Sequence, residues 1–575
     1  MFSRIAALFH QRLPVCLGFL ALVSVLSQLD IADECSWTGT GPGLAFDENL
    51  NTAGGVYLVE SVLNAGLAAL DPRTVHEIFE SPNYFPDYPP LGRLPLGVGN
   101  ALFGRLGGLG EHSFYLISYA RIGSAVTFSL LVFLLVRFTQ QQAGTLAGVV
   151  TGLSLWATPR VFGHAHLANV ETTMNLTYAG FLLVSLNHLA FHPQLRARDG
   201  VLPGFVLGLA LLTKIQAIFL PPVITIWMLW HFRKRALLPL GVIVVTSAVT
   251  FLLGWPWLWS DPIGRSLSYF AQTTNRAVLY CFYMGVRYTD RSVPWHYPFV
   301  IFLLTTPLPW LLLGSWGMWR SVSCQSTPLT ANNNIGRHKT SSNESGGNDS
   351  SSPWTWRANS LLLGAFWLPL IVFAIPGVPV YDGERLFLMV WPIFSIWVGM
   401  AAARCHDGLI SQTPCWLRCL IAVLAIVLPV GGMFTLQPAY LSFYAVQAGT
   451  LPGASAAGME QNYWGDAVTA DFLKAACRSI PPGSTLTVAP VLHPLFPRFL
   501  KTDSWLKHRP DLEIVAYDEK SVPPPRYVLW IHRRADPWPA LLSPSEGTRI
   551  LARIKRQGVV LAEVLEFPVP PTSFD

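Results

Sequence analysis

The sequence predicts an α-helical polytopic membrane protein that carries a small α/β domain at its C-terminal end. Of its 575 residues, 51% are hydrophobic and only 13% are charged, whereas soluble proteins typically have about 25% charged residues. Apolar runs recur through residues 1–435, and about 20 such residues cross the hydrocarbon layer as a helix. After residue 436 the composition is that of a soluble domain. These observations predict a membrane module at residues 1–435 and a soluble domain at residues 436–575.

Eleven apolar runs are predicted to span the membrane. The first, residues 13–29, follows Arg4 and Arg12 as the apolar part of a signal peptide does, but no small-residue cleavage site follows it. We therefore interpret it as an uncleaved first helix. The other runs lie at residues 114–136, 143–158, 172–190, 201–213, 217–230, 239–255, 298–318, 359–375, 386–403 and 417–435.

The basic residues predict the orientation of these spans. With a cytoplasmic N-terminus, alternation places Arg233, Lys234 and Arg235, among many other basic loop residues, inside, as the positive-inside rule requires. The same alternation puts the acidic loop 30–112 and the C-terminal domain outside. We therefore expect a multi-pass protein of the plasma or inner membrane. Because the basic residues lie in short loops between apolar runs, we attribute the net charge of +6 to membrane orientation and not to nucleic-acid binding.

Two further segments differ in composition from the apolar runs. Residues 321–353 are rich in Ser, Thr, Asn and Gly and predict a disordered cytoplasmic linker. In the C-terminal domain, the alternation of apolar runs predicts a helix at 466–480 and strands at 485–490, 513–517, 526–531 and 558–566. This domain contains no nucleotide loop, GxSxG or metal-type spacing, so we expect it to serve recognition or support.

The cysteines do not define a metal or redox site. None of the eight belongs to a CxxC pair, and the predicted external side holds Cys35, Cys281 and Cys477. The sequence leaves open whether any of these three form a disulfide.

Polar residues gather where the predicted helices end on the external side, and such residues near a membrane mark a candidate site because they are costly to bury. They are Asp47 and Glu48, Asp87, then Arg160, His164, His166 and Glu171 in the second external turn, then Lys214, Tyr381 and Arg385. Each alone has an ordinary explanation as a solvated loop pair, a polar turn, an interfacial side chain or a helix end. His164 and His166 are two residues apart and cannot share a helix face, so we expect no metal site there.

Several short motifs occur in a characteristic order. They are Asp47–Glu48, Tyr-Pro-Pro-Leu-Gly at 88–92, Arg160 with Glu171, Leu-Leu-Thr-Lys at 211–214, Pro-Trp-His-Tyr at 294–297, and Arg385 followed by Pro392. In this order, over residues 13–435, they resemble the dolichyl-phosphate-mannose protein mannosyltransferase and aminoarabinose transferase superfamily, the GT-C glycosyltransferases of family 39 type. The chain departs from that pattern at Glu171, where many members have aspartate.

The resemblance implies transfer of a sugar from a polyprenyl-phosphate donor to an acceptor hydroxyl outside the cytoplasm, with inversion. The catalytic base of the family maps to Asp47, with Glu48 beside it. Lys214, Arg385 and Arg160 are expected to stabilise the leaving lipid phosphate. Asp87, Glu171, His164, His166 and Tyr381 are supporting candidates. No metal or other cofactor is expected, and the acceptor is a protein, a lipid or a glycan.

Other functions of multi-helix membrane proteins fit the sequence less well. A lipid or polysaccharide transporter or flippase is expected to have internal repeats and polar groups near the membrane midplane, whereas here the polar groups collect at one face. A polymer ligase has its large external loop late in the chain. An oligosaccharyltransferase-like enzyme uses a diphosphate donor and a metal, and the sequence has no matching acidic external motif.

The predicted topology can be tested with two tags. A tag at the C-terminus and a tag inserted at 341–352 are expected on opposite sides of the membrane, because three predicted spans separate them. Protease protection or a compartment-specific label measures this. Both tags on one side would contradict the eleven-span prediction.

Overall fold

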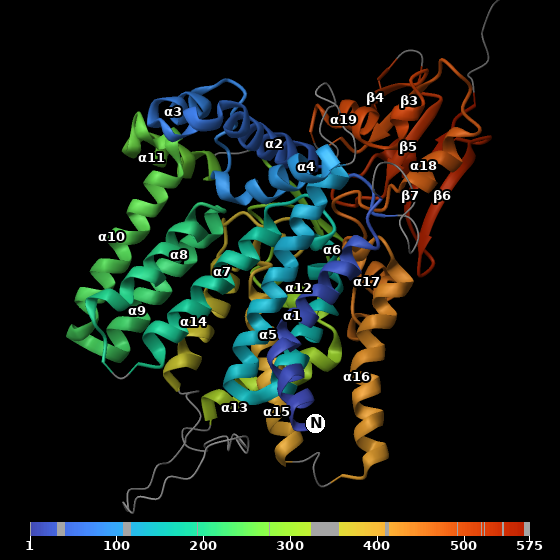
Figure 1. The fold of residues 1–575 in the computed structure, drawn as a ribbon. Coiled ribbons are helices and arrows are strands. Elements are labelled where there is room, and N and C mark those ends of the chain that lie inside the picture. The colour runs from blue at the N-terminus through green and yellow to red at the C-terminus, as the bar shows by residue number, and fades with distance from the viewer. Residues whose placement is uncertain are drawn as a thin grey trace, which may run out of the picture.

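The computed structural model combines a large helical part with a C-terminal sheet domain (Figure 1). It describes residues 2–30, 41–106, 117–192, 194–274, 277–323, 356–408, 413–491, 493–518, 520–521, 524–542 and 545–568. The N-terminal helix starts at the end of the molecule opposite the sheet domain (Figure 1). The predicted fold class, a helical membrane protein with an α/β C-terminal domain, is confirmed.

Each predicted apolar run coincides with helical structure. The corresponding helices are α1 (Phe2–Leu26), α5 (Ile117–Trp156), α7 (Glu171–Ser185), α8 (Val201–Leu211), α9 (Leu220–Phe232), α10 (Leu237–Gly254), α12 (Tyr297–Thr305), α13 (Leu308–Ser323), α14 (Trp356–Phe373), α15 (Val390–Gly408) and α16 (Cys415–Leu436). Two predicted runs share α5, which is interrupted by non-helical backbone at Ala143 and Gly144. The run 298–318 instead divides into α12 and α13, which meet at 119°.

The number of spans remains a prediction. Judged by length and apolar composition, four helical stretches in the described part of the chain are able to cross a membrane, or five if α12 and α13 together form one span. One of the four, Glu48–Leu70, lies in the predicted external loop 30–112 and was not predicted as a span. Several of the predicted runs form shorter helices.

The predicted external loop, residues 30–112, is mostly helical where it is described. It forms α2 (Glu48–Ala65), α3 (Pro72–Glu80) and α4 (Leu94–Leu106). Together with α11 (Pro262–Thr274), these helices lie at the same end of the molecule as the sheet domain (Figure 1). Helix α3 starts at Pro72, directly after Asp71, whose side chain accepts the Arg73 N–H at 3.0 Å. This is a common helix start, because proline and a capping acid suit the first turn.

Glycines allow α2 and α4 to pack with almost no space between their backbones. A Cβ added to Gly97 would lie 2.1 Å from the Gly55 carbonyl oxygen, and one added to Gly55 would lie 2.4 Å from the Arg93 carbonyl oxygen. Helix α4 in turn meets α5, where a Cβ at Gly123 would lie 2.0 Å from the Pro95 carbonyl oxygen. These contacts set the position of α2, and therefore of the acidic pair at its start.

The C-terminal domain is built on a mixed five-stranded sheet with the order β4-β3-β5-β7-β6. The strands are β3 (Thr485–Ala489), β4 (Glu513–Ala516), β5 (Tyr527–Ile531), β6 (Arg549–Arg556) and β7 (Val559–Glu566). Strand β3 pairs in parallel with β4 and β5, while β7 is antiparallel to β5 and β6. Four strands were predicted. Strand β6 was missed because basic residues interrupt its apolar alternation, and the predicted helix 466–480 is shorter, as α18 (Ala470–Cys477).

The sheet domain is tied to the helical part by a short hairpin. The strands β1 (Tyr280–Tyr283) and β2 (Val286–Thr289) are antiparallel. The Gly285 N–H donates to the Gly458 carbonyl at 2.9 Å, and the Arg287 Nε donates to the Ala535 carbonyl at 2.6 Å. The hairpin thus contacts both the segment that follows α16 and the sheet domain.

The structure tests only part of the predictions on the cysteines and the linker. Cys281 and Cys477 are free thiols and are buried, whereas Cys35 and most of the predicted linker 321–353 lie outside the described residues. A disulfide between Cys281 and Cys477 is therefore not formed.

Close packing at Gly97 provides a test of how α2 is positioned. Gly97→Ala is expected to destabilise the protein by about 1–3 kcal/mol, because the methyl group overpacks the contact with α2. The measurement is the midpoint of thermal unfolding in detergent. The control is Gly241→Ala in α10, where an added Cβ meets nothing within 4 Å and where alanine favours the helix by up to about 1 kcal/mol. Equal midpoints for the two variants would contradict the packing argument.

Candidate active site

Arg385 is the centre of a buried cluster of charges. It begins the short 3₁₀ helix η8 (Arg385–Phe387), directly after a tight turn in which Asp382 and Gly383 have φ of 56° and 64°. Its guanidinium is ion-paired with Asp47 and donates to Glu171 Oε1 at 2.7 Å and to Asp382 Oδ2 at 3.3 Å. One buried cation therefore joins the first loop, the turn between α5 and α7, and the segment before α15.

Asp47 is the most accessible carboxylate of this cluster. It precedes α2 as its N-cap residue, and 37% of its side chain is exposed, compared with 1% for Glu171 and 5% for Asp382. A molecule entering from outside the protein can therefore reach Asp47, but not the other two carboxylates, without a rearrangement.

Glu48 is enclosed and fully engaged. Its carboxylate accepts the backbone N–H groups of Ala45 at 2.8 Å and Ala168 at 2.7 Å. It also accepts two hydrogen bonds from Arg121 of α5, at 2.8 and 2.7 Å. Because these four bonds join the first loop to α5 and to the second turn, Glu48 is placed to fix the position of Asp47, and it is not open to a ligand.

Lys214 lies in an extended break between α8 and the 3₁₀ helix η5 (Ile215–Phe219). Its Nζ donates to Glu171 Oε1 at 2.8 Å, which is the oxygen that also accepts from Arg385. The Tyr-Pro-Pro-Leu-Gly box docks on this break, since the Leu91 N–H donates to the Leu212 carbonyl at 3.0 Å. Glu171 therefore holds two cations side by side.

A small cavity of about 10 Å³ lies beside these two cations, which is room for about one water molecule. It is lined by Glu171, Asn175, Lys214, Gln216 and Arg385, together with Met174, Leu386, Leu388 and Met389. The Oε2 of Glu171 and the amide oxygens of Asn175 and Gln216 are buried there without a hydrogen-bond partner among the described atoms. The cavity is thus lined by both polar and apolar side chains.

The turn between α5 and α7 forms a separate network next to the cluster. Arg160 of α6 (Pro159–Ala165) is ion-paired with Glu384, and its Nε donates to the Phe443 carbonyl at 2.8 Å. The other oxygen of Glu384 accepts the Tyr463 hydroxyl at 3.0 Å. Arg160 is only 2% exposed and pairs with Glu384 instead of lining the cavity beside Arg385, so its predicted role as a phosphate ligand is not supported by its position.

Burial keeps the two histidines of this turn neutral. It lowers the pKa of His164 to about 3 and that of His166 to about 4. The Nε2 of His164 lies 3.3 Å from the Tyr463 hydroxyl, and the Nδ1 of His166 lies 2.8 Å from the Phe162 carbonyl oxygen. Within the described residues, no three His, Cys, Asp or Glu side chains are grouped so as to hold a metal ion.

Asp87 and Tyr381 lie at the edge of the Arg385 cluster. Asp87 forms two 2.8 Å hydrogen bonds with Arg93. The Arg93 guanidinium lies 4.9 Å from the ring centre of Tyr88, and Lys214 Nζ lies 5.8 Å from the same ring centre. Among the described residues, Arg93 and Tyr88 connect Asp87 to the cations. Tyr381 is buried just before the Asp382 turn.

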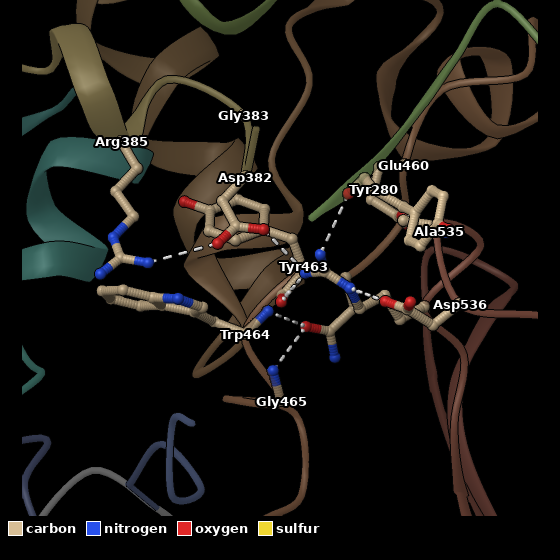
Figure 2. A network of polar contacts seen from close by, with 12 residues as sticks. Tyr280, Asp382, Gly383, Arg385, Glu460, Tyr463, Trp464, Gly465, Ala535 and Asp536 are labelled. Atoms are coloured by element: carbon tan, nitrogen blue, oxygen red, sulfur yellow. Dashed lines mark hydrogen bonds and ion pairs between the residues drawn. The ribbon is translucent and has the colours of Figure 1, made fainter. Parts of the chain in front are cut away.

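The C-terminal domain also reaches this cluster. The Trp464 ring lies 4.4 Å from the Arg385 guanidinium carbon, and Arg533 donates to Asp382 at 2.8 Å. Figure 2 shows Trp464 lying along Arg385, with Asp382 between Arg385 and Tyr463.

The structure brings together Asp47, Glu48, Glu171, Lys214 and Arg385 of the sequence-predicted residues, and it places Arg160, His164 and His166 in the neighbouring network. Sequence reasoning missed Arg121, Trp464 and Arg533. Arg121 had a signal, since it is the only charged residue inside the apolar run 114–136. Arg533 stands in a basic and polar stretch like any surface arginine.

The geometry supports two kinds of chemistry. Lys214 and Arg385 are cations at the wall of one cavity and so are suited to a small anion such as a phosphate. Asp47 is an accessible carboxylate in direct contact with one of them, so it is suited to take a proton from a group that meets the bound anion.

Part of the chain matches a known protein family. Residues 89–259 match the family described as dolichyl-phosphate-mannose-protein mannosyltransferase. This match confirms the predicted resemblance over a segment that contains Arg160, Glu171 and Lys214 and excludes Asp47 and Arg385. No curated protein matches the chain at a significant level.

Solved structures also align with the chain. ArnT from Cupriavidus metallidurans in the apo state aligns at 16% identity over 97% of this chain and 98% of that chain, with a TM-score of 0.47. The same protein bound to undecaprenyl phosphate aligns at 16% identity over 96% and 97%, with a TM-score of 0.46. The archaeal oligosaccharyltransferase AglB from Archaeoglobus fulgidus, in complex with an inhibitory peptide and a dolichol-phosphate, aligns at 11% identity over 91% and 70%, with a TM-score of 0.46.

Proposed function

We propose that this protein is a membrane-embedded glycosyltransferase of the GT-C type. In this proposal it transfers a sugar from a polyprenyl-phosphate donor to an acceptor hydroxyl at the extracytoplasmic face, by an inverting displacement. The family match over residues 89–259 supports the lipid-phosphate-sugar donor, because that family is described by such a donor.

One observation carries the proposal: the direct ion pair between Asp47 and Arg385. A base for the acceptor and a cation for the leaving group have to reach the same anomeric carbon, the base from the side opposite to the leaving phosphate. Asp47 and Arg385 are far apart in sequence and come from different segments, yet they are in contact, and Lys214 adds a second cation through Glu171. The polar groups also gather at the end of the helices that carries the sheet domain, which favours an interfacial reaction over transport through the midplane.

The reaction is a single displacement. Asp47 takes the proton of the acceptor hydroxyl as its oxygen attacks the anomeric carbon. The bond between that carbon and the phosphate oxygen breaks, and its electron pair leaves with the lipid phosphate. Arg385 and Lys214 stabilise the negative charge of the departing phosphate. Since a phosphate monoester is a stable anion, no general acid is needed, and attack opposite to the leaving group inverts the configuration.

The ion pair also orders the steps. Without a ligand, Arg385 engages the carboxylate of Asp47. A donor phosphate that binds Arg385 competes with Asp47 for the same guanidinium. Donor binding therefore releases the base for the acceptor.

The site is proposed to lie outside the cytoplasm. The charge cluster is built from the starts of α2 and α7, the break before η5 and the turn before α15, and it contacts the C-terminal domain. The positive-inside rule puts that domain outside. The long apolar tail of a polyprenyl donor then stays in the bilayer while its phosphate reaches the cluster.

Substitution of the proposed base tests the mechanism. Asp47→Asn is expected to reduce sugar transfer by roughly 10² to 10⁴, because the amide keeps the shape of the side chain but cannot accept the proton. The measurement is the transfer rate of the purified protein with polyprenyl-phosphate sugars, followed by release of the lipid phosphate. Binding of polyprenyl phosphate should persist in the variant.

Two variants serve as comparisons for Asp47→Asn. Asp71→Asn alters an exposed acid of the same external segment and should keep the wild-type rate. Glu48→Gln should lower the rate less than Asp47→Asn does, since Glu48 acts by holding the loop. If a well-folded Asp47→Asn protein retains most of its rate, the base is another group, and Glu171 and Asp87 are the next carboxylates to test.

The cations are tested by a separate pair of substitutions. Lys214→Ala and Arg385→Ala are expected to weaken donor use, because each removes positive charge from the cavity. The measurement is the donor KM and kcat in protein that elutes as a folded species. Lys214→Arg, which retains the charge, should recover part of the loss. Unchanged donor kinetics in both alanine variants would rule out this phosphate site.

A further inference from the structure

Arg533 is an arginine of the sheet domain that enters the helical part of the protein. It follows β5, and its side chain is only 2% exposed. Its NH1 donates to the Tyr463 carbonyl at 2.5 Å and to Asp382 Oδ1 at 2.8 Å, while its Nε donates to Asp536 at 2.6 Å. A buried arginine is costly unless it is paired, so its pairs with Asp382 and Asp536 hold it in place.

Asp382 is shared between two arginines. Its Oδ1 accepts from Arg533. Its Oδ2 accepts from Arg385 at 3.3 Å, as the contact between Asp382 and Arg385 in Figure 2 shows. The turn that carries it leaves little freedom, because a Cβ at Gly383 would lie 2.9 Å from the Arg160 guanidinium and 3.1 Å from the Tyr463 ring. Asp382 therefore links the sheet domain to Arg385 through a rigid turn.

The ring of Trp464, a residue of the C-terminal domain, lies against the guanidinium of Arg385. The indole is 1% exposed, and its ring centre lies 4.4 Å from the Arg385 guanidinium carbon. The Asn462 side chain fixes this segment by accepting the backbone N–H groups of Trp464 at 3.3 Å and Gly465 at 3.0 Å. The flat ring blocks one face of Arg385, and a cation over an aromatic face is stabilised without losing its charge.

Arg533 also completes the charge balance. The ion pairs around Arg385 join the carboxylates of Asp47, Glu171 and Asp382 with the cations of Lys214, Arg385 and Arg533. Further out, Asp536 faces both Arg533 and Arg287. Without Arg533 the carboxylates outnumber the cations in the cluster, and a phosphate approaching Arg385 would be repelled.

From these contacts we propose that the C-terminal domain is part of the donor site and that Arg533 and Trp464 are positioning residues for Arg385. Arg533 neutralises Asp382, so that the charge of Arg385 stays available to the donor phosphate, and Trp464 fixes the plane of its guanidinium. This inference rests on the proposed function, in which Arg385 binds that phosphate.

The first experiment separates donor binding from turnover in the full-length protein. Arg533→Met is expected to raise the donor KM and the Kd for polyprenyl phosphate roughly 2- to 30-fold, with a smaller change in kcat. Arg533→Lys should recover part of the loss because it restores the charge. Trp464→Leu should act in the same direction, and Trp464→Phe, which retains an aromatic face, should act less strongly.

The matched control is Arg526→Ala. Arg526 belongs to the same domain and is also paired with an acid, Glu566 at 2.9 Å, but it is half-exposed and lies outside the Arg385 cluster. Its loss should leave the KM, the Kd and the kcat unchanged. A rise in KM as large as that of Arg533→Met would mean that any weakening of the domain impairs the enzyme, which would overturn the inference.

A double-mutant cycle tests whether Arg533 acts through Arg385. In an Arg385→Lys background, Arg533→Met and Trp464→Leu should have much smaller effects on polyprenyl-phosphate binding than in the wild type, because residues that act through one another are not additive. Full additivity would overturn the inference and assign both residues to structural support alone.

The outcomes separate this inference from the proposed function. If the wild type transfers sugar and binds polyprenyl phosphate while the Arg533 and Trp464 variants match it in KM and Kd, only the inference is overturned. If the wild type neither transfers sugar from any polyprenyl-phosphate donor nor binds the lipid phosphate, the proposed function itself is wrong, and the inference is overturned with it.

Discussion

The neutralisation of one buried arginine constrains much of this structure. A guanidinium removed from water costs several kcal/mol unless anions compensate it, and Arg385 is compensated by three carboxylates from three separate segments. The first loop, the start of α7 and the turn before α15 must therefore meet at one place. Two sets of contacts position Asp47 at that place. They are the hydrogen bonds of Glu48 with Arg121 and the glycine packing between α2 and α4.

The same cluster combines stability with reactivity, because its members differ in exposure. Glu171 and Asp382 are enclosed, so their contacts with Arg385 persist, whereas Asp47 is open to the outside. A ligand anion can replace Asp47 at the guanidinium without exposing the other two pairs. A binding site built from ion pairs requires one exchangeable partner among fixed ones. The acidic pair Asp47–Glu48 accordingly contains one accessible and one enclosed carboxylate.

The sequence predicted the helices and several site residues, because both follow from local rules. An apolar run must satisfy its own backbone groups in a membrane, so each predicted run is helical. Charges at the ends of such runs, including Asp47, Lys214 and Arg385, stand out against the apolar background. The partners Arg533 and Trp464 do not, because their role arises from contacts with residues far away in sequence, and their local context is an ordinary soluble domain. Helices α2 and α3 were missed as helices, and α2 was missed although Glu48–Leu70 is long and apolar enough to cross a membrane.

The shared carboxylate of Asp382 has a consequence for biosynthesis. A ribosome produces Asp47, Glu171, Lys214 and Arg385 before it reaches Arg533, which lies near the end of the chain. The inserted helices therefore pass through a stage in which Asp382 and Arg385 are present and the sheet domain is still being translated. The charge cluster reaches balance only after β5 has emerged and folded against the helices. The charge cluster is therefore completed only after the last part of the chain has been synthesised.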